Sequence, residues 1–470
     1  MSATALGKPR ASVWGLLLEA LRGTQQDFTE GSITRAVFLL ATPMVLEMLM
    51  ESLFAVVDVF WVTRLGSNAV ATVGLTESML TLVYSVAFGV SLSTTAMVAR
   101  RIGEKDKAGA ATAASQAILL GIAVALLLGA PGFWFSEHLL RWMGGGPALV
   151  ETGHRYTAVV FAGSTSIMLL FLNNAIFRGA GDASIAMRVL WFSNLINLAL
   201  DPCLIFGVGP FPRMGVTGAA VSTLTGRSLG VVYQLWILTR GRSRIRLTPG
   251  CFRVVPRVIG SLIRVSTTGV LQFAIAHTSW ILLVRMISAF GAFAVAGYTI
   301  GIRVFIFLIL PSWGLSGAAA TMVGQNLGAK KPERAERAVY LTAFYNMIFL
   351  GAVAIAFIGA PVQIVHLFTR DPAVVSFAVD CLRIVAFGNL FYAFGMVMVQ
   401  AFNGAGDTVT PTIINLFGFW FVEIPLAWVL AFPKHLQVRG VFASIPIAEV
   451  LITVASLVVF MRGGWKRAKI

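Results

Sequence analysis

The sequence predicts an all-α integral membrane protein with twelve transmembrane helices in two six-helix bundles, related by a parallel pseudo-two-fold repeat. Three observations support this fold class. The 470 residues are 57% apolar and only 12% charged, with a mean hydropathy of +0.83. Apolar stretches long enough to cross a bilayer recur along the whole chain. Short motifs also recur at one fixed offset, which indicates that a six-span unit is duplicated.

The repeat has an offset of 225 residues. Four pairs of segments show it: 65–71 with 290–296, 100–106 with 325–331, 179–183 with 404–408, and Gly215 with Gly440. Each copy contains six predicted spans, so both copies enter the membrane with the same orientation. The expected symmetry axis therefore runs along the membrane normal, and a substrate path is expected between the two halves.

The predicted spans follow the apolar stretches in order. They are 36–60, 74–98, 110–131, 155–177, 186–207, 214–238, 258–288, 293–321, 337–359, 376–402, 411–432 and 439–461. The expected domains are a cytoplasmic N-terminal segment (1–35), an N-terminal bundle (36–238), a basic linker (239–257), a C-terminal bundle (258–461) and a cytoplasmic tail (462–470). The first segment contains the short apolar run WGLLL, which predicts an interfacial or cytoplasmic helix and no signal peptide.

The basic residues lie mostly in alternate loops, with the densest group in the 239–257 linker. This bias predicts a multi-pass protein of a bacterial-type inner (plasma) membrane, with both termini cytoplasmic. The net charge of +16 does not indicate nucleic-acid binding, because no basic patch has its own folded domain. Three cysteines without paired spacing argue against a disulfide framework or a zinc site. Phosphate-loop, HExxH and GxSxG motifs are absent from the sequence, which argues against those enzyme classes.

The stretch from Pro43 to Asp58 carries three acids inside the first predicted span. Glu47, Glu51 and Asp58 are spaced by four and seven residues, which places them on one helix face. A carboxylate at the middle of a bilayer costs roughly 2.5–3.5 kcal/mol on insertion scales, so its default interpretation is functional. The stretch predicts a coupling-ion site on a helix that can bend at its proline.

The fifth span adds a second acidic position. Asn197 and Asp201 share a helix face, and Pro202 weakens the helical hydrogen-bond ladder beside them. A carboxylate next to an amide suits H+ or Na+, and the alternative is a structural polar pair. Asn174 is either a site member or an interhelical hydrogen-bonding residue. Thr223 either reaches the same cavity or bonds its own backbone.

These acids have no counterparts in the second half. At the 225-residue offset, Asp58 falls on Leu283 and Asp201 falls on Leu426. We therefore expect a symmetric scaffold in which only the first bundle carries the ion site.

Several motifs resemble the multidrug and toxic compound extrusion (MATE) family, in particular its DinF-like branch. They are DFTEGSITRAVFLLATP (27–43), VDVFWVTRLGSNAVATVGL (57–75), NNAIFRGAGD (173–182), NLINLALDPCLIFG (194–207), GVTGAAVST (215–223), MVGQNLGAKKPERA (322–335) and AFNGAGDTVTP (401–411). Together these segments extend over nearly the whole chain. The resemblance implies two bundles in a V, no cofactor, no enzymatic activity, and export of organic compounds by antiport with H+ or Na+.

The resemblance also implies a cation site. Carried over residue by residue, it comprises Asp58, Asn174, Asn197, Asp201 and Thr223. Na+, if it is the coupling ion, would lie at Asp58, Asn197 and Asp201, and no other metal is expected.

Other residues follow from the same resemblance. Pro43 matches the proline at which the first helix bends, and Glu47, Glu51, Asn173 and Gln272 are expected to line the cavity. NorM-like members also use acids in the seventh and tenth helices. Here the seventh helix offers Gln272 and His277, and the deep part of the tenth has no acid. That departure favours the DinF-like interpretation.

The expected function is multidrug or organic-cation export. The expected partners are small cationic or amphipathic organic molecules and the lipid bilayer, and the chain is expected to act as a monomer. A lipid-linked saccharide flippase of the same superfamily is the alternative. It would need a cationic cavity for a pyrophosphate, whereas the first bundle gathers acids. A non-transporting receptor or enzyme scaffold fits poorly with the repeat and the buried acids.

Overall fold

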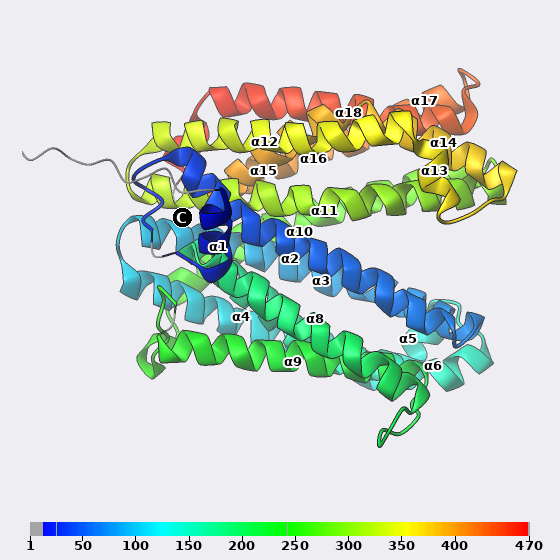
Figure 1. The fold of residues 1–470 in the computed structure, drawn as a ribbon, viewed down its shortest axis with the longest axis horizontal. Coiled ribbons are helices and arrows are strands. Elements are labelled where there is room, and N and C mark those ends of the chain that lie inside the picture. The colour runs from blue at the N-terminus through cyan, green and yellow to red at the C-terminus, as the bar shows by residue number, and fades with distance from the viewer. Residues whose placement is uncertain (1–12, 25, 242, 469–470) are drawn as a thin grey trace, which may run out of the picture.

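The computed structural model describes residues 13–24, 26–241 and 243–468, and it is built from helices (Figure 1). The first half contains α1 (Val13–Arg22), α2 (Ile33–Thr63), α3 (Ser67–Gly103), α4 (Lys107–Trp134), α5 (Ser136–Trp142), α6 (Pro147–Ala162), α7 (Ser164–Ala180), α8 (Ala183–Phe206) and α9 (Val216–Arg240). The second half contains η1 (Pro249–Phe252), α10 (Pro256–Ser288), α11 (Ala292–Gly328), α12 (Pro332–Gly359), α13 (Pro361–His366), α14 (Pro372–Ala386), α15 (Asn389–Ala405), α16 (Val409–Asn415), the π-helix η2 (Leu416–Glu423), α17 (Ile424–Ala431), α18 (Gln437–Met461) and η3 (Gly464–Arg467).

The predicted fold class is confirmed. Within the described ranges, nine helical segments are long and apolar enough to cross a membrane, and the bent pair α14 and α15 makes a tenth. The more polar helices α2 and α9 have 31 and 25 residues, so they also have the length to span a bilayer. With these two, twelve spans are accounted for.

Some spans are interrupted where the sequence predicted continuous helices. The fourth span, expected at 155–177, consists of α6 and α7, which meet at Gly163. The tenth, expected at 376–402, bends by 58° between α14 and α15. A Cβ at Gly388, in this bend, would lie 2.7 Å from Pro446 Cβ, so the close approach of α18 requires glycine there.

The helix bounds repeat at the offset seen in the sequence. α3 and α11 both have 37 residues and begin at positions 67 and 292, and α4 and α12 both have 28 residues and begin at 107 and 332. Across the two halves, α2 packs against α11 and α3 packs against α10. In the repeat α2 corresponds to α10 and α3 corresponds to α11, so these two contacts are equivalent. Equivalent contacts of this kind are expected when a pseudo-two-fold axis relates the two bundles.

The two halves approach most closely at one end, where α3 and α11 cross. A Cβ on Gly103 would lie 1.9 Å from the carbonyl oxygen of Gln325, and a Cβ on Gly328 would lie 2.1 Å from that of Arg100. The two glycines are equivalent in the repeat, so the same tight crossing is built twice. We call this end, which also carries α1 and the C-terminal residues, the closed end (Figure 1).

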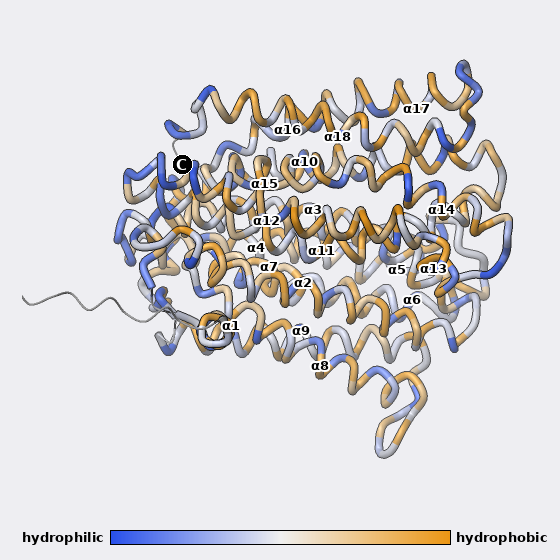
Figure 2. Tube along the Cα trace, turned by 45° about the horizontal axis from the view of Figure 1, so that its top comes forward, coloured by the Kyte–Doolittle hydropathy of each residue, from blue (hydrophilic) through white to orange (hydrophobic). Residues whose placement is uncertain are grey.

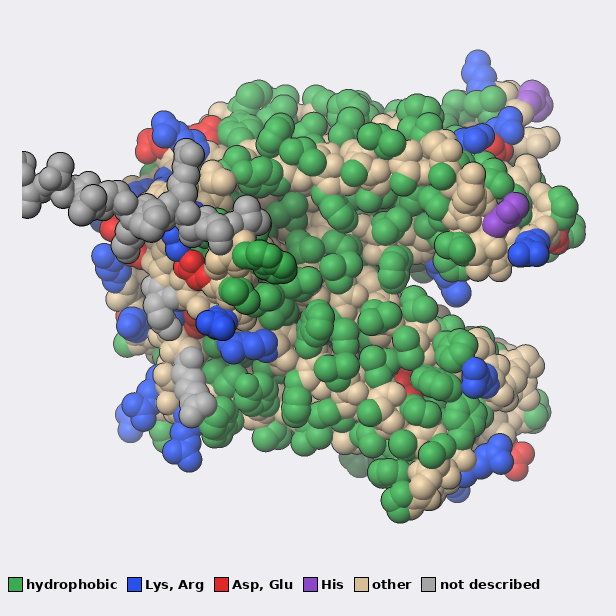
Figure 3. All heavy atoms as spheres, in the orientation of Figure 1, with side chains coloured by type: hydrophobic (Ala, Val, Ile, Leu, Met, Phe, Trp, Pro, Cys, Tyr) green, Lys and Arg blue, Asp and Glu red, His purple; other side chains and the backbone are tan. Residues whose placement is uncertain are grey.

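The bundles separate towards the opposite end. The space-filling view shows a cleft between them there, far from α1 (Figure 3). Large apolar side chains such as Leu127, Trp134 and Ile355 are exposed on the outer surface of the bundles. Hydrophilic residues gather at the two ends of the helices (Figure 2). This distribution suits a protein whose flanks contact lipid and whose ends contact water.

Candidate functional site

A cavity of about 310 Å³, here called the central cavity, lies between the two bundles. Its walls come from α2, α3, α7, α8 and α9 of the first half and from α10, α11 and α15 of the second. Its polar lining consists of Glu47, Glu51, Tyr84, Ser91, Thr95, Asn174, Arg178, Asn194, Arg227, Gln400 and Asn403, and its apolar lining includes Met44, Met48, Phe88, Phe171, Phe273 and Trp313. Pockets for small organic ligands typically begin at this size and combine apolar walls with a few polar groups. The central cavity is therefore the candidate substrate site.

Glu47 is the most enclosed charged group of the central cavity, with 1% of its surface exposed. Its Oε1 accepts a hydrogen bond from Asn174 Nδ2 at 3.1 Å and lies 3.7 Å from Arg178 Nη1. Asn174 in turn accepts a bond from Gln234 Nε2 at 2.7 Å. The other oxygen, Oε2, is buried without a hydrogen-bond partner among the residues that the structure describes. Glu47 thus keeps one acceptor available for a bound molecule.

Two more polar pairs lie on the first-bundle side of the cavity. Glu51, one turn after Glu47 on α2, accepts a bond from Asn194 Nδ2 at 3.2 Å. Arg227 on α9 donates to the hydroxyl of Tyr84 at 3.1 Å. Acidic and basic groups therefore face the same apolar space, which suits amphipathic organic molecules.

A second polar cluster joins α8 to α9 around Asp201, which is fully buried. The Ser222 hydroxyl donates to Asp201 Oδ1. Asn197 Nδ2 donates to Ser222 Oγ at 3.2 Å and to Thr223 Oγ1 at 2.9 Å. Within the described part of the chain, Asp201 Oδ2 and Asn197 Oδ1 are buried and accept no hydrogen bond. Two unpartnered oxygens in a dry site are suitable ligands for a proton or a small cation.

Asp58 lies half-buried on α2 and interacts electrostatically with Asp201, Glu77 and Arg227. The structure thus brings Asp58 near Asp201, and it joins Asp201 to Asn197 and Thr223 through one hydrogen-bonded cluster. We call Asp58, Asn197, Asp201, Ser222 and Thr223 the first-bundle carboxylate site. The structure places Asn174, which the resemblance assigned to this set, with Glu47 in the central cavity.

The remaining predicted residues occupy different positions. Pro43 is buried within α2, which continues as one helix from Ile33 to Thr63. Asn173 is fully buried and Gln272 is 7% exposed, and neither contributes to the wall of the central cavity. Glu47 and Glu51 do contribute to that wall.

Several polar residues of these sites were not predicted from the sequence, among them Asn194 and Tyr84 in the central cavity. Ser222 and Gln234 are two further examples. Ser222 directly precedes Thr223 in the GVTGAAVST motif, and only the packing of α8 on α9 shows that it reaches Asp201. Gln234 lies three turns further along α9 and reaches Asn174 in the same way. A polar residue on α9 facing α8 or α7 was the only available signal.

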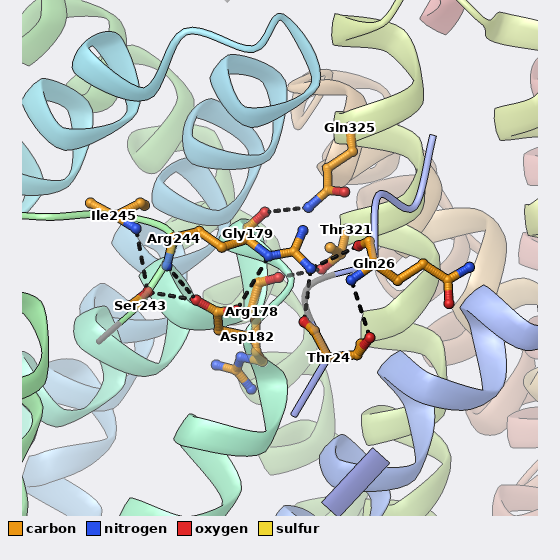
Figure 4. A network of polar contacts seen from close by, with 10 residues as sticks. All are labelled: Thr24, Gln26, Arg178, Gly179, Asp182, Ser243, Arg244, Ile245, Thr321 and Gln325. Atoms are coloured by element: carbon orange, nitrogen blue, oxygen red, sulfur yellow. Dashed lines mark hydrogen bonds and ion pairs between the residues drawn. The ribbon is translucent and has the colours of Figure 1, made fainter. Parts of the chain in front are cut away.

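A network of hydrogen bonds and ion pairs connects several segments at the closed end (Figure 4). Arg244 of the linker forms an ion pair with Asp182 at 3.4 Å and donates to the carbonyl oxygens of Thr24 and Gln26 at 3.0 and 2.8 Å. Its guanidinium carbon also lies 5.1 Å from the centre of the Phe28 ring. The segment that joins α1 to α2 is thereby bound to the first bundle.

The same segment is held by the second bundle. Arg334 donates to the carbonyl oxygens of Gly31 and Glu30 at 2.7 and 2.8 Å, and Lys331 donates to that of Thr29 at 3.0 Å. Above it, Gln325 Nε2 donates to the carbonyl oxygen of Gly179 at 2.9 Å. We call residues 23–24 and 26–32 the latch, because basic residues from both halves bind carbonyl groups of this stretch.

One carboxyl group of the latch is stabilised in its charged form. Burial raises the pKa of Asp27, but hydrogen bonds from the side chain and backbone of Thr29 and the positive charges of Lys105 and Arg244 outweigh it. The pKa of Asp27 therefore lies below its usual value of 3.8. The Thr29 hydroxyl is 2.6 Å and its backbone nitrogen 2.8 Å from Asp27 Oδ1.

Curated relatives match nearly the whole chain. It is 26% identical over 442 residues to the "Probable multidrug resistance protein NorM" of Thermotoga maritima, covering 93% of this chain and 94% of that protein. It is 28% identical over 415 residues to the "Multidrug resistance protein NorM" of Burkholderia vietnamiensis, covering 86% and 88%. It is 26% identical over 409 residues to the FAD transporter of Shewanella oneidensis, covering 86% of this chain and 88% of that protein.

Solved structures share the fold. A MATE structure in the straight conformation aligns with a TM-score of 0.86 at 26% identity, covering 95% of this chain and 97% of that one. A MOP superfamily transporter from Pyrococcus furiosus aligns with a TM-score of 0.87 at 25% identity, covering 94% and 99%.

The family comparison matches each half of the chain once. The sequence model of the MatE family fits residues 43–203 and 270–429, which together make up more than half of the chain. The two matched segments fall in the two copies of the repeat, and each contains most of the helices of its bundle. The chain therefore belongs to the MatE family, whose members are membrane transporters and not enzymes.

Proposed function

We propose that this transporter is a secondary active exporter of small cationic or amphipathic organic molecules, driven by antiport of H+ or Na+. The observation that carries the proposal is the buried carboxylate of Asp201, whose Oδ2 has no protein partner among the described residues. A buried ionised carboxylate is costly in a membrane, and a bound proton or cation removes that cost. Relatives named for multidrug resistance support the export of small molecules.

The substrate site and the ion site are connected by one helix. α2 carries Glu47 and Glu51 in the central cavity and Asp58 near Asp201. Binding of the ion would change the balance of charges along this helix, and Pro43 is the position at which it bends most easily. Ion binding and substrate release are then coupled through the path of α2.

The two bundles, 36–238 and 258–461, would move as units joined by the basic linker 239–257. The closed end would face the cytoplasm, because the basic linker and both ends of the described chain lie there. In that orientation the cleft would face outward, and the arrangement of the bundles would correspond to an outward-facing state. The first bundle carries acids, whereas the seventh helix and the deep part of the tenth carry none, and this difference supports the DinF-like branch.

The test is transport by the purified protein in proteoliposomes with an imposed pH or Na+ gradient. Asp201→Asn and Asp58→Asn should abolish gradient-driven export of an organic cation such as ethidium. The matched control is Asp380→Asn on α14, whose carboxylate pairs with Arg439 at 2.7 Å on the surface of the other bundle. Equal gradient-driven export in wild type and Asp201→Asn would refute the assignment of the ion site.

A lipid-linked saccharide flippase remains the alternative activity, but it is not favoured. The central cavity contains Glu47 and Glu51 beside Arg178 and Arg227, so it is not the purely cationic space that a pyrophosphate requires.

A further inference from the structure

A second pocket lies wholly inside the C-terminal bundle, away from the central cavity. It has a volume of about 200 Å³ and is walled by α10, α11, α14, α15, η2 and α18. We infer that this C-terminal pocket binds a small organic ammonium ion through Glu423 and Glu449, within a wall that includes Trp280, Tyr298 and Tyr392. This binding site is additional to the ion site of the first bundle, and it can be tested without measuring transport.

Glu423 occupies an unusual backbone position. It is the last residue of the π-helix η2 and is 4% exposed. Its Oε2 accepts a hydrogen bond from the Ser279 hydroxyl on α10 at 2.9 Å. π-Helical turns are rare and are frequently found at functional sites, because the extra residue re-aims the side chains beside it. Here the π-turn ends at the acid that lines the pocket.

Asn389 places an unpartnered polar side chain in the wall of the pocket, and this observation is independent of the two acids. It is fully buried at the start of α15, in the wall of the C-terminal pocket. Neither its Nδ2 nor its Oδ1 forms a hydrogen bond within the described ranges. A buried amide with both ends unsatisfied requires an explanation, such as a bound molecule or water. Asn173 and Asn403 share this property, and of these three residues Asn389 is the one that lines the C-terminal pocket. The 58° bend between α14 and α15 places this amide beside the pocket.

The negative charge of the pocket has no counter-charge. Glu449 of α18 faces the same space as Glu423, and none of the residues that line the pocket is Lys, Arg or His. The central cavity differs, because Arg178 and Arg227 accompany its two acids. Two acids in a membrane-embedded pocket require protons or a cation to compensate their charge.

The walls of the pocket select the kind of cation. Aromatic rings attract organic ammonium ions through their electron-rich faces, and a carboxylate beside them completes the recognition. A volume of about 200 Å³ is far larger than a bare metal ion requires. An organic ammonium ion therefore fits better than an inorganic cation.

The two acids of this pocket do not lie at the positions that the 225-residue repeat assigns to the polar residues of the first-bundle site. Leu283, the counterpart of Asp58, lies in the wall of the pocket. The counterparts of Asn197 and Thr223 are positions 422 and 448, so Glu423 and Glu449 each lie one residue beyond them. The second bundle thus has a carboxylate pocket in the corresponding region, with acids contributed from shifted positions on the eleventh and twelfth spans.

Calorimetric titration of the full-length protein in nanodiscs with tetramethylammonium chloride tests the inference. Wild type should bind the probe, and Glu449→Gln and Glu423→Gln should each weaken binding by about tenfold or more. Trp280→Leu serves as a second variant with both acids intact, and it should also weaken binding. Glu333→Gln, an exposed acid in the first turn of α12, is the matched control and should bind like wild type.

A separate titration with NaCl distinguishes the ligand classes. Na+ binding that depends on Glu423 and Glu449, without tetramethylammonium binding, would overturn the inference of an organic ligand. Unchanged tetramethylammonium affinity in both glutamine variants would also overturn it. Asp201→Asn should keep the binding of tetramethylammonium while losing ion-driven export, so failure of the pocket and failure of the proposed function give different results.

Discussion

Arg178 Nη1 lies 3.7 Å from Glu47 Oε1, and this ion pair links the central cavity to the closed end. Glu47 is almost fully buried, whereas the Arg178 side chain is 23% exposed. Arg178 also contacts the second bundle, because its backbone carbonyl oxygen accepts a hydrogen bond from the Thr321 hydroxyl at 3.1 Å. A change in the charge of Glu47 can therefore alter the position of Arg178, and through it the contact between the two bundles.

Removal of Arg178 should lower the stability of the folded protein, because the buried carboxylate of Glu47 loses its positive neighbour. Arg178→Gln leaves Glu47 without its cationic neighbour, so we expect a loss of about 1–3 kcal/mol in the stability of the folded protein. Adding Glu47→Gln should recover most of the loss, since the uncompensated charge is then gone. Thermal unfolding of the single and double variants in detergent measures both effects, and additive losses would contradict the pairing.

The Ser222 hydroxyl should tune the ion site without forming it. Ser222→Ala removes the donor to Asp201 and one acceptor of Asn197, so the ion concentration that half-saturates export should change by about tenfold. The substrate KM should stay the same, because Ser222 lies outside the central cavity. The control is Ser228→Ala, on α9 like Ser222, which removes a hydroxyl that pairs with Ser166 of α7 at 2.9 Å and should alter neither value.

Pro43 should matter for movement and not for folding. Pro43→Ala restores a backbone donor within α2 and stiffens the helix, so we expect equal or higher thermal stability together with slower export. Pro131→Ala in α4, a helical proline away from the central cavity, should leave export unchanged. Export at the wild-type rate in Pro43→Ala would show that α2 does not need to bend there.

The latch should hold the two bundles together at the closed end. Arg334→Gln removes the guanidinium that binds the carbonyls of Phe28, Glu30 and Gly31, so the closed end should open more often. Spin labels placed where α4 and α12 begin, at the closed end, should report a longer distance between the two helices in this variant than in wild type. Arg462→Gln, at the end of α18, is a matched loss of one basic residue and should give wild-type distances.

The same segment should make stability depend on acidity. The pKa of Asp27 is lower in the folded protein than its usual value of 3.8, so its contribution to stability is complete above that value. The contribution is lost as the pH falls through the folded pKa, because protonation weakens the bonds from Thr29. Asp27→Asn should therefore lower the unfolding temperature at neutral pH and narrow its difference from wild type under strongly acidic conditions.

Much of the fold could be predicted because it depends on local properties of the chain. Apolar length gave the spans, and a duplicated pattern gave the symmetry that reappears in the bounds of α3 and α11. Breaks within spans were harder to predict, since the bend beside Gly388 depends on the approach of α18 and not on local helix propensity. Family membership followed from motifs spread over both halves, and the family comparison confirmed it.

The sequence by itself determined that this protein is a duplicated helical transporter with acids in its first and fifth spans. Only the tertiary structure decided how those acids are distributed: Asp201 bonds Ser222, and Asn174 joins Glu47 in the central cavity. The reason is physical. Whether a residue is buried in a membrane follows from the chain around it, whereas its partner depends on the rotation and depth of a helix distant in sequence, which packing alone sets.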